Sequence, residues 1–325
     1  MQRFKDILCV VGDVEADRHV VERAVTLAGN NQARLTVVDV VEHVTAGIGM
    51  PEGGPISADL QAALVSVHED GLETLVNPYR ARIAIQTRVL TGMPFIEIIR
   101  EVLRNGRDLV IKPPEHRDWL DRLFGSEDMH LLRKCPCPVW LIKPGKRKSY
   151  RHILAAVDAG DAYPEEELAS RRALRQQILE MACSLALSEF AELHVANALE
   201  TISESTMRDS LHIPEENIIA YLEEERLNHV ACLDALMQEV TGDLGQDALD
   251  YLKPQTHLVT GSAHKEIPAL AKQIGADLIV MGTVARTGIP GFIMGNTAET
   301  ILNQIDCSVL AVKPPGFTSP VTLAD

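Results

Sequence analysis

Short apolar runs alternate along the chain with longer segments in which apolar residues recur at every third or fourth position. The run "HILAAVD" at 152–158 has the length of a buried strand, and so do "DLIVMG" at 277–282 and "SVLAVKP" at 308–314. Apolar residues at helical spacing predict a helix between the first two runs and are Leu174, Ile178, Met181, Ala182 and Leu185. Strands that are apolar throughout indicate a parallel sheet covered on both faces, which predicts an α/β fold.

Glycines mark the expected ends of two further helices. One apolar helix face ends before Gly275 and consists of Ile267, Leu270, Ala271 and Ile274. Another ends before Gly29 and Asn30 and consists of Val20, Ala24, Leu27 and Ala28. Because glycine commonly closes a helix, both helices are expected to stop at these positions.

The same order of strands and helices occurs twice. "KDILCVVGD" at 5–13 resembles "RHILAAVDA" at 151–159, an offset of 146 residues. The later pair "CPVWLIKP" and "CSVLAVKP" has an offset of 170, which places an insertion in the second copy between about residues 200 and 254. The two copies, joined by the polar linker "PGKRKS", are expected to form two five-stranded domains in tandem. The expected boundaries are 1–145 for the first domain, 151–316 for the second and 317–325 for a C-terminal tail.

Composition and charge limit the expected partners. The 325 residues are 46% hydrophobic and 24% charged, which is typical of a globular protein, and they carry a net charge of −15. Such a field repels nucleic-acid phosphates, so no nucleic-acid partner is expected. ATP is not excluded, because local glycine amides and one or two cations can outweigh a distant surface field.

The sequence predicts a cytoplasmic protein without a membrane partner or a metal site. No stretch approaches the roughly 18 apolar residues of a membrane span, and "MQRFKDILCVVGD" reaches an acid before a signal-peptide core could form. Most cysteines lie in apolar runs, as buried residues of a reducing compartment do. They are Cys9, Cys135, Cys137, Cys183, Cys232 and Cys307. Neither the "CPC" segment nor the eleven histidines show metal-ligand spacing.

Candidate ligand residues follow the strands of the second half. In open α/β sheets, ligands bind outside the carboxyl ends of strands, where the connectivity reverses. Val157 and Asp158 end the first of these strands, Gly261 follows the third and Gly282 follows the fourth. Asp158 either accepts hydrogen bonds from a ribose or a base, or closes a local Asx-turn. Gly282 either lets the backbone approach a ligand or only makes a tight turn.

The segment "MGTVARTGIPGFIMGNTAE" supplies the other candidate residues. Asn296, which follows Gly295, and Glu299 predict a capping box that opens a helix. The amides and positive dipole of a helix start suit phosphate, although capping alone would explain the same residues. Asn296 or Thr297 would add a side-chain donor, and Arg286 would neutralise a phosphate unless it is solvated. The chain contains no P-loop, no G-x-G-x-x-G and no G-x-S-x-G motif.

Several characteristic segments occur in both halves. In the second half they are "ILAAVD", "LVTG", "ADLIVMGT", "RTGIPGFIMGNTAE" and "CSVLAVKP", and in the first "DLVIK" and "FGSEDMHLLRKCPCPVWLIKP". Over residues 4–315, the chain thereby resembles the tandem members of the universal stress protein family. The resemblance implies a Rossmann-like parallel sheet of order 3-2-1-4-5 in each half. It also implies that the fifth strands, 139–143 and 310–313, pair antiparallel. The chain would then be a pseudo-two-fold dimer, with a further homodimer left open.

The ATP-binding members of this family carry G-2x-G-9x-G-[ST] after the fourth strand and an aspartate after the first. In the second half Asp158, Gly282 and Gly295 match, whereas Ala285 replaces the second glycine and Asn296 replaces the hydroxyl residue. The resemblance therefore implies a site for ATP or a related nucleotide in the second half.

The first half departs further from this motif. Gly125 and Ser126 remain, but Lys112 and Glu115 stand at the first two glycine positions, and Gly12 stands at the aspartate position. The carboxylate of Glu115 would face a phosphate, so the first half is predicted not to bind ATP.

The expected function is that of a non-catalytic stress-response protein with a small-molecule site in its second half. A weak ATPase or self-phosphorylating enzyme is an alternative, although no residue resembles a positioned general base or a metal-binding pair. The apolar segment 288–294 permits another alternative, a module that binds an apolar or nucleotide-sugar-like molecule. The insertion would either line that pocket or cover the sheet edge with a helix, through Ile218, Leu222, Leu227, Val230, Leu233 and Met237.

Overall fold

The computed structural model contains two compact units. One takes residues Met1–Lys148 together with Phe317–Asp325, and the other takes Ser149–Gly316. The residues that the structure describes are 4–44, 55–115, 126–144, 149–160, 163–200, 207, 214–242, 246–283 and 295–323. The central part of the predicted linker lies outside these ranges.

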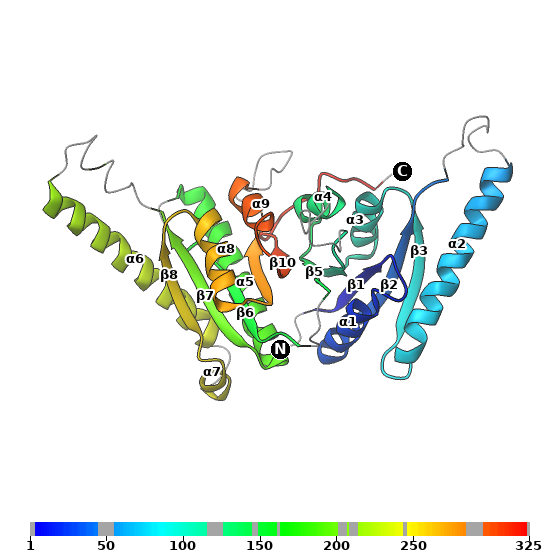
Figure 1. The fold of residues 1–325 in the computed structure, drawn as a ribbon, viewed down its shortest axis with the longest axis horizontal. Coiled ribbons are helices and arrows are strands. Elements are labelled where there is room, and N and C mark those ends of the chain that lie inside the picture. Colours follow the sequence, from blue (N-terminus) through cyan, green and yellow to red (C-terminus); the bar gives the residue numbers. More distant parts are fainter. Residues whose placement is uncertain are drawn as a thin grey trace. The chain divides into compact units, whose positions relative to one another are not determined.

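The first unit is a parallel sheet covered by helices (Figure 1). Its strands are β1 (Asp6–Val11), β2 (Arg34–Val41), β3 (Ile85–Thr91), β4 (Leu109–Lys112) and β5 (Val139–Leu141). Its helices are α1 (Arg18–Asn31), α2 (Pro55–Val76), η1 (Asn77–Tyr79), α3 (Pro94–Asn105) and α4 (Ser126–Lys134). The strands lie in the order β3-β2-β1-β4-β5, with parallel pairing throughout.

The second unit repeats this architecture. Its strands are β6 (His152–Ala156), β7 (Glu192–Leu199), β8 (Gln255–Thr260), β9 (Leu278–Gly282) and β10 (Ser308–Val312). Its helices are α5 (Glu165–Glu189), α6 (Glu215–Gly242), α7 (Gln246–Leu252), α8 (Ala263–Ile274) and α9 (Asn296–Leu302). The order β8-β7-β6-β9-β10 is again 3-2-1-4-5, and the pairs are parallel. The predicted fold class is confirmed.

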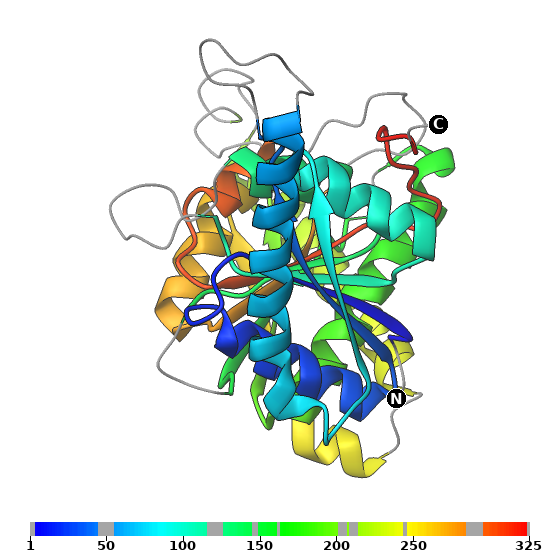
Figure 2. The same cartoon turned by 90° about the vertical axis from the view of Figure 1, so that its right-hand side faces the viewer.

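The inner strands are largely apolar because helices cover the sheets, whereas the edge strands β3 (IQTRVLT) and β8 (QTHLVT) contain polar residues. Every residue of β1 and of β10 is buried. Helix α2 packs along β2 and β3 (Figure 2). Helix α1 buries the predicted apolar face of Val20, Ala24, Leu27 and Ala28. The apolar periods of the sequence therefore correspond to the core of each unit.

One of the two predicted helix ends is correct. Helix α8 ends before Gly275, which has a φ of +64°. Helix α1 does not stop before Gly29. It continues to Asn31, and Gln32 follows in the left-handed conformation with a φ of 53°. The buried Asn31 accepts the amide of Phe4 at 3.1 Å, a contact with β1's entry that holds the last helical turn in place.

Helices α6 and α7 occupy the predicted insertion. Helix α6 packs against α5 and β7 and buries Ile218, Leu233, Leu236 and Val240. Leu227, which was predicted on its apolar face, is 52% exposed. These contacts favour a helix that covers the sheet.

The segment after the second unit, expected as a tail, groups with the first unit. Phe317 is buried, and Nε of Arg100 in α3 donates to the carbonyl oxygen of Thr322 at 3.3 Å. The first unit is therefore built from two separate parts of the sequence.

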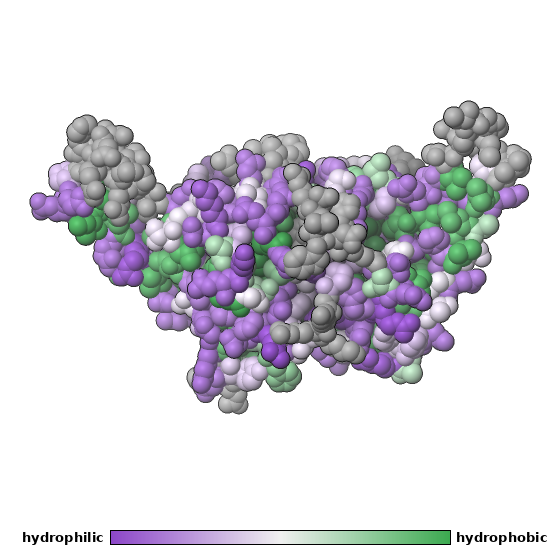
Figure 3. Space-filling view, viewed as in Figure 1, coloured by the Kyte–Doolittle hydropathy of each residue, from purple (hydrophilic) through white to green (hydrophobic). Residues whose placement is uncertain are grey.

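Hydrophilic side chains cover much of the face drawn in Figure 3. Exposed apolar side chains occur on α2, where Leu60 and Val67 are 53% and 67% exposed. Among the helices that the structure describes, none combines the length and the apolar character needed to cross a bilayer.

Candidate functional site

In the second unit, the connectivity reverses at the carboxyl ends of β6 and β9. Strand β6 pairs with β7 on one side and with β9 on the other, where Ala156 is in register with Met281. Asp158 follows β6 and Gly282 ends β9, so these two predicted residues lie at the same edge of adjacent strands. Gly261 follows β8, two strands away from β6.

Asp158 accepts hydrogen bonds from residues close to it in the sequence. The side chain is 50% exposed and accepts the amide of Gly160 at 3.2 Å, the hydroxyl of Tyr163 at 2.6 Å and Nη1 of Arg171 at 3.2 Å. The Arg171 guanidinium also lies 3.5 Å from the centre of the Tyr163 ring. Burial, aided by the hydrogen bond to Asp158, raises the pKa of Tyr163 to about 12, so this hydroxyl is a donor at neutral pH. The Asx-turn that the sequence offered as one reading is thus present.

Val157 is linked to the inserted helix through a buried amide. Nδ2 of Asn197 in β7 donates to the carbonyl oxygen of Val157 at 3.1 Å. Oδ1 of the same amide lies 2.8 Å from Nδ1 of His229 in α6, so Nδ1 must carry the proton that is donated. A Cβ added at Gly160 would lie 3.6 Å from the His229 ring, which places the imidazole beside the turn at Asp158. Neither Asn197 nor His229 belongs to a motif that the sequence analysis recognised. The polar Asn197 inside the apolar run "AELHVANAL" was the signal that could have indicated this contact.

The backbone conformation at position 261 requires glycine. Its φ of +134° is a conformation that other residues rarely adopt, and a Cβ there would lie 2.9 Å from Glu266. Gly92 repeats the arrangement in the first unit, with a φ of +138° and Glu97 at 2.9 Å. The repetition in both units assigns Gly261 to the turn between strand and helix.

Gly282 permits a helix to approach the sheet. A Cβ at this position would lie 2.9 Å from Cδ2 of Leu174 in α5, so the missing side chain faces that helix. This third reading differs from both sequence interpretations. Ala285, Arg286 and the apolar segment 288–294 lie outside the described residues.

Helix α9 begins at Asn296, one position earlier than a capping box with Asn296 at the N-cap requires. Gly295 takes the N-cap position, with φ −59° and ψ 134°, and within the described residues no side chain caps this helix. The capping-box prediction is wrong, because Asn296 is already helical and its side chain is exposed. Thr297 is also exposed, in the first turn. Both side chains therefore remain available at the helix start.

A buried lysine adds a cation at the same edge. Lys313 directly follows β10 and is 4% exposed, and its Nζ donates to Oγ1 of the buried Thr283 at 2.5 Å. Thr283 follows β9, and its carbonyl oxygen accepts the amide of Gly295 at 3.3 Å. The ammonium therefore lies at the base of the segment that joins β9 to α9. Its position after the run "SVLAV" was the sequence signal.

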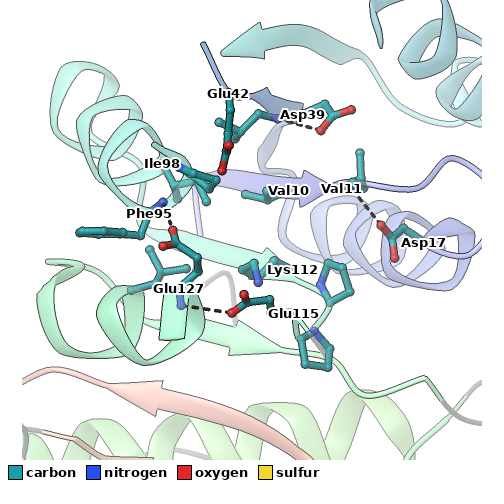
Figure 4. Close-up of a pocket in the computed structure, with 16 residues that line it drawn as sticks. Val10, Val11, Asp17, Asp39, Glu42, Phe95, Ile98, Lys112, Glu115 and Glu127 are labelled. Carbon is teal, nitrogen blue, oxygen red and sulfur yellow. Dashed lines mark hydrogen bonds between the residues drawn. The ribbon is translucent and has the colours of Figure 1, made fainter. Parts of the chain in front are cut away.

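The first unit contains a cavity of about 310 Å³ at the carboxyl ends of its strands (Figure 4). Its apolar walls include Val10, Phe95, Ile98 and Leu131. Five carboxylates and one ammonium also line it, from Asp17, Asp39, Glu42, Glu115, Glu127 and Lys112. This balance of charge suits a neutral or cationic ligand with an apolar body rather than a phosphate.

The start of α4 is occupied by carboxylates of the chain itself. Glu115 accepts the amide of Glu127 at 3.1 Å, and the Glu127 side chain accepts the amide of Phe95 at 3.1 Å. Lys112 is paired with Asp128, which also accepts the amide of Glu115 at 2.7 Å. Carboxylates of the chain itself therefore occupy the region that corresponds to the predicted phosphate site, and Gly125 lies outside the described residues.

The turn after β1 is closed in a similar way. Oδ2 of the fully buried Asp17 accepts the amides of Gly12 and Asp13, both at 2.9 Å. The backbone at the first-strand position is thus bound by an internal acid.

Comparisons with known proteins agree with the fold and the repeat. The chain matches the model of the Universal stress protein family over residues 3–143 and again over 149–313. Universal stress protein E of Escherichia coli (strain K12) is 28% identical over all of this chain and 99% of its own length. The Haemophilus influenzae homologue is 27% identical, over 96% of this chain and 98% of its own.

Two solved structures extend the comparison. A universal stress protein from Pseudomonas aeruginosa UCBPP-PA14 has a TM-score of 0.66 and 26% identity, over 96% of this chain and 94% of that one. A universal stress protein from Archaeoglobus fulgidus DSM 4304 has a TM-score of 0.61 at 17% identity, over 94% and 98%, and supports the fold alone. The resemblance to the tandem members of this family is confirmed, and universal stress protein E, the relative that the sequence most resembles, matches the chain over its full length.

Proposed function

Because the chain belongs to the universal stress protein family, with one such domain in each half, we propose that it is a non-catalytic stress-response protein that binds an adenine nucleotide or a related ligand in its second unit. The observation that carries the proposal is the position of Asp158 and Gly282 at adjacent strand ends, where the connectivity reverses. The start of α9 lies close to the end of β9, because the amide of Gly295 donates to the carbonyl oxygen of Thr283 at 3.3 Å, and Asn296 and Thr297 are exposed there.

The chemistry of this edge suits a nucleotide. Asp158 would accept a hydrogen bond from a ribose hydroxyl, which would replace the Tyr163 hydroxyl as donor. The amides at the start of α9 would receive a phosphate, and the buried ammonium of Lys313 would balance its charge. His229 lies beside the Asp158 turn and would contact the ligand from the inserted helix.

The first unit differs at each of these points. Its helix-start amide at Glu127 is bound by Glu115, and its Lys112 is paired with Asp128. A phosphate would have to displace carboxylates from partners that they already bind. One nucleotide per chain, in the second unit, is therefore the expected stoichiometry.

Isothermal titration calorimetry of the intact chain with ATP tests this proposal. We expect one site per chain and a 10- to 100-fold weaker affinity for Asp158→Ala, because a hydrogen bond to a charged group contributes about 1.5–3 kcal/mol. Asp13→Ala, at the corresponding turn of the first unit, is the matched control and should bind as the parent does. Absence of heat at millimolar ATP, or equal weakening in both variants, would contradict the proposal. Phosphate release at the same rate in the parent and in Asp158→Ala would exclude the ATPase alternative.

The cavity of the first unit favours a second candidate function, the binding of a neutral or cationic small molecule with an apolar body. Val10, Phe95 and Ile98 line it, and carboxylates surround them. Native mass spectrometry of gently purified protein should then show an added mass that is absent from an Ile98→Trp variant, whose indole would fill the cavity. An Ile98→Val control should keep the added mass. An unmodified mass for the parent, or the same added mass in Ile98→Trp, would rule out this site.

A further inference from the structure

Histidines from three strands meet on one face of the second sheet, at the amino ends of its strands. His152 opens β6, and Glu192 opens β7 in register with it. His194 follows two residues later on the same face, and His257 lies on the neighbouring strand β8. This edge is opposite to the carboxyl edge considered for the nucleotide, so the cluster is a separate feature.

Three of these side chains direct ligand atoms toward one another. Nδ1 of His152 lies 3.7 Å from Oε2 of Glu192, and Nε2 of His194 lies 3.8 Å from the same oxygen. All three atoms are within 4.8 Å of one another. A zinc ion with ligands at about 2.0–2.2 Å places them roughly 3.3 Å apart in a tetrahedral site. Small side-chain rotations would therefore bring the three atoms onto one ion.

The two imidazole nitrogens need a partner. Among the described residues, Nδ1 of His152 and Nε2 of His194 are buried and have no hydrogen-bond partner. His194 is 4% exposed, so water does not readily satisfy its nitrogen. Leaving such groups unsatisfied costs about 1–3 kcal/mol each, which a metal ion would remove.

Neighbouring residues fix the ligands in a suitable orientation. Nδ1 of His194 lies 3.0 Å from Nε2 of His257, and the two rings stack with centroids 5.2 Å apart. If Nδ1 carries the donated proton, the lone pair of His194 is on Nε2, which faces Glu192. Nε2 of Gln255 donates to Oε2 of Glu192 at 3.4 Å. Such outer partners are typical of metal-binding histidines and carboxylates.

At the amino ends of its strands, the first unit has an ion-pair network in place of the histidines. Asp6, at the position of His152, is paired with Arg107 at 2.5 Å, and Arg107 is also paired with Glu101 at 2.8 Å. Asp108 of that unit accepts the amides of Lys5 and Asp6, as Asp277 does for Arg151 and His152 in the second.

This common anchor places Ala276 of the second unit at the position of Arg107, one residue before the aspartate. The buried guanidinium is therefore replaced by a methyl group in the second unit. Imidazole nitrogens face the acid there instead of a fixed cation.

We propose that His152, Glu192 and His194 bind a divalent transition-metal ion of the zinc type, oriented by His257 and Gln255. Two imidazoles and one carboxylate are a donor set that zinc prefers, whereas Mg²⁺ and Ca²⁺ prefer oxygen ligands. Glu192 is 60% exposed, which provides an entry path and leaves a fourth position for water. The ion would join β6 to β7.

Metal titration of the full, tag-free chain tests the site. Chelator-treated protein should bind one equivalent of Zn²⁺ in competition with a chromophoric chelator, with a raised melting temperature, and should not bind Mg²⁺ at the same concentration. Co²⁺ should give the intense visible bands of a four-coordinate ion. Glu192→Gln and His152→Ala should each lower the Zn²⁺ affinity at least tenfold, and His257→Gln should lower it 10- to 100-fold.

Two controls separate ligation from misfolding. His264→Ala removes a histidine of the same unit outside the cluster and should keep the parent affinity. Glu192→Gln replaces a largely exposed side chain by one of the same shape, so the melting temperature of the metal-free variant should equal that of the parent. Failure of the parent to bind Zn²⁺, or equal affinity of the parent, Glu192→Gln and His152→Ala, would overturn the proposal.

Discussion

Replacing Arg107 with alanine is expected to lower the free energy of unfolding of the first unit by about 3–5 kcal/mol. The guanidinium is 5% exposed and pairs with Asp6 at 2.5 Å and with Glu101 at 2.8 Å, whose side chains are 4% and 0% exposed. The variant would remove the buried cation that both acids share and leave each with one partly exposed arginine, Arg34 on Asp6 and Arg88 on Glu101. Breaking a buried pair in this way costs more than the pair itself contributes, because the remaining charges stay desolvated.

Urea denaturation followed by tryptophan fluorescence measures this effect selectively. Both tryptophans, Trp119 and Trp140, belong to the first half, so the signal reports on that unit. Arg34→Ala is the control, because Arg34 also contacts Asp6 at 2.5 Å but is 77% exposed. An exposed pair contributes at most about 1 kcal/mol. Equal losses in the two variants would mean that the buried network is not a main source of stability.

Replacing Asp17 with alanine is expected to lower the free energy of unfolding of the first unit by about 3 kcal/mol. The fully buried carboxylate accepts the amides of Gly12 and Asp13 at 2.9 Å each, at the turn that borders the cavity. Each hydrogen bond to a charged group contributes about 1.5–3 kcal/mol, and the two amides would lose their acceptor in the variant. The same fluorescence-detected unfolding curve gives the change.

Asp13→Ala provides a matched comparison for this prediction. Asp13 also accepts two backbone amides, those of Glu15 at 3.0 Å and Ala16 at 2.9 Å, but at an exposed turn. Water can replace an exposed acceptor, so a loss of about 1 kcal/mol or less is expected. A loss for Asp17→Ala no larger than that for Asp13→Ala would show that burial of the carboxylate does not determine its contribution.

The residue pattern predicted the parallel α/β fold and the family resemblance implied the strand order, but some element ends could not be predicted. Strand β9 reads "LIVMG" and has no charged residue, which is typical of a strand covered on both faces. Gly275 closes α8 through a local preference that the sequence displays. The end of α1 depends on Asn31 and Phe4, which are 27 positions apart, and local patterns carry no information about such a contact.

The candidate site also contains residues that the sequence predicted and residues that only long-range contacts bring together. Asp158 and Gly282 could be assigned to one edge because the strand order fixes which strand ends are neighbours. His229 could not, because it reaches Asn197 across 32 positions from an inserted helix. In the histidine cluster, the contacting residues His194 and His257 are 63 positions apart, whereas metal motifs are recognised by short spacings within one loop or helix. Parallel strands need long crossovers, so their side-by-side contacts are distant in sequence.

The return of residues 317–323 to the first unit changes how the duplication can be understood. The second unit is, in effect, a guest inserted near the end of its host, because Phe317 and Thr322 contribute to the packing of the first. During synthesis, the last segment of the first unit becomes available only after the whole second unit has been translated. A fragment cut after the first copy would therefore be an unfinished domain, whereas the guest is continuous in sequence.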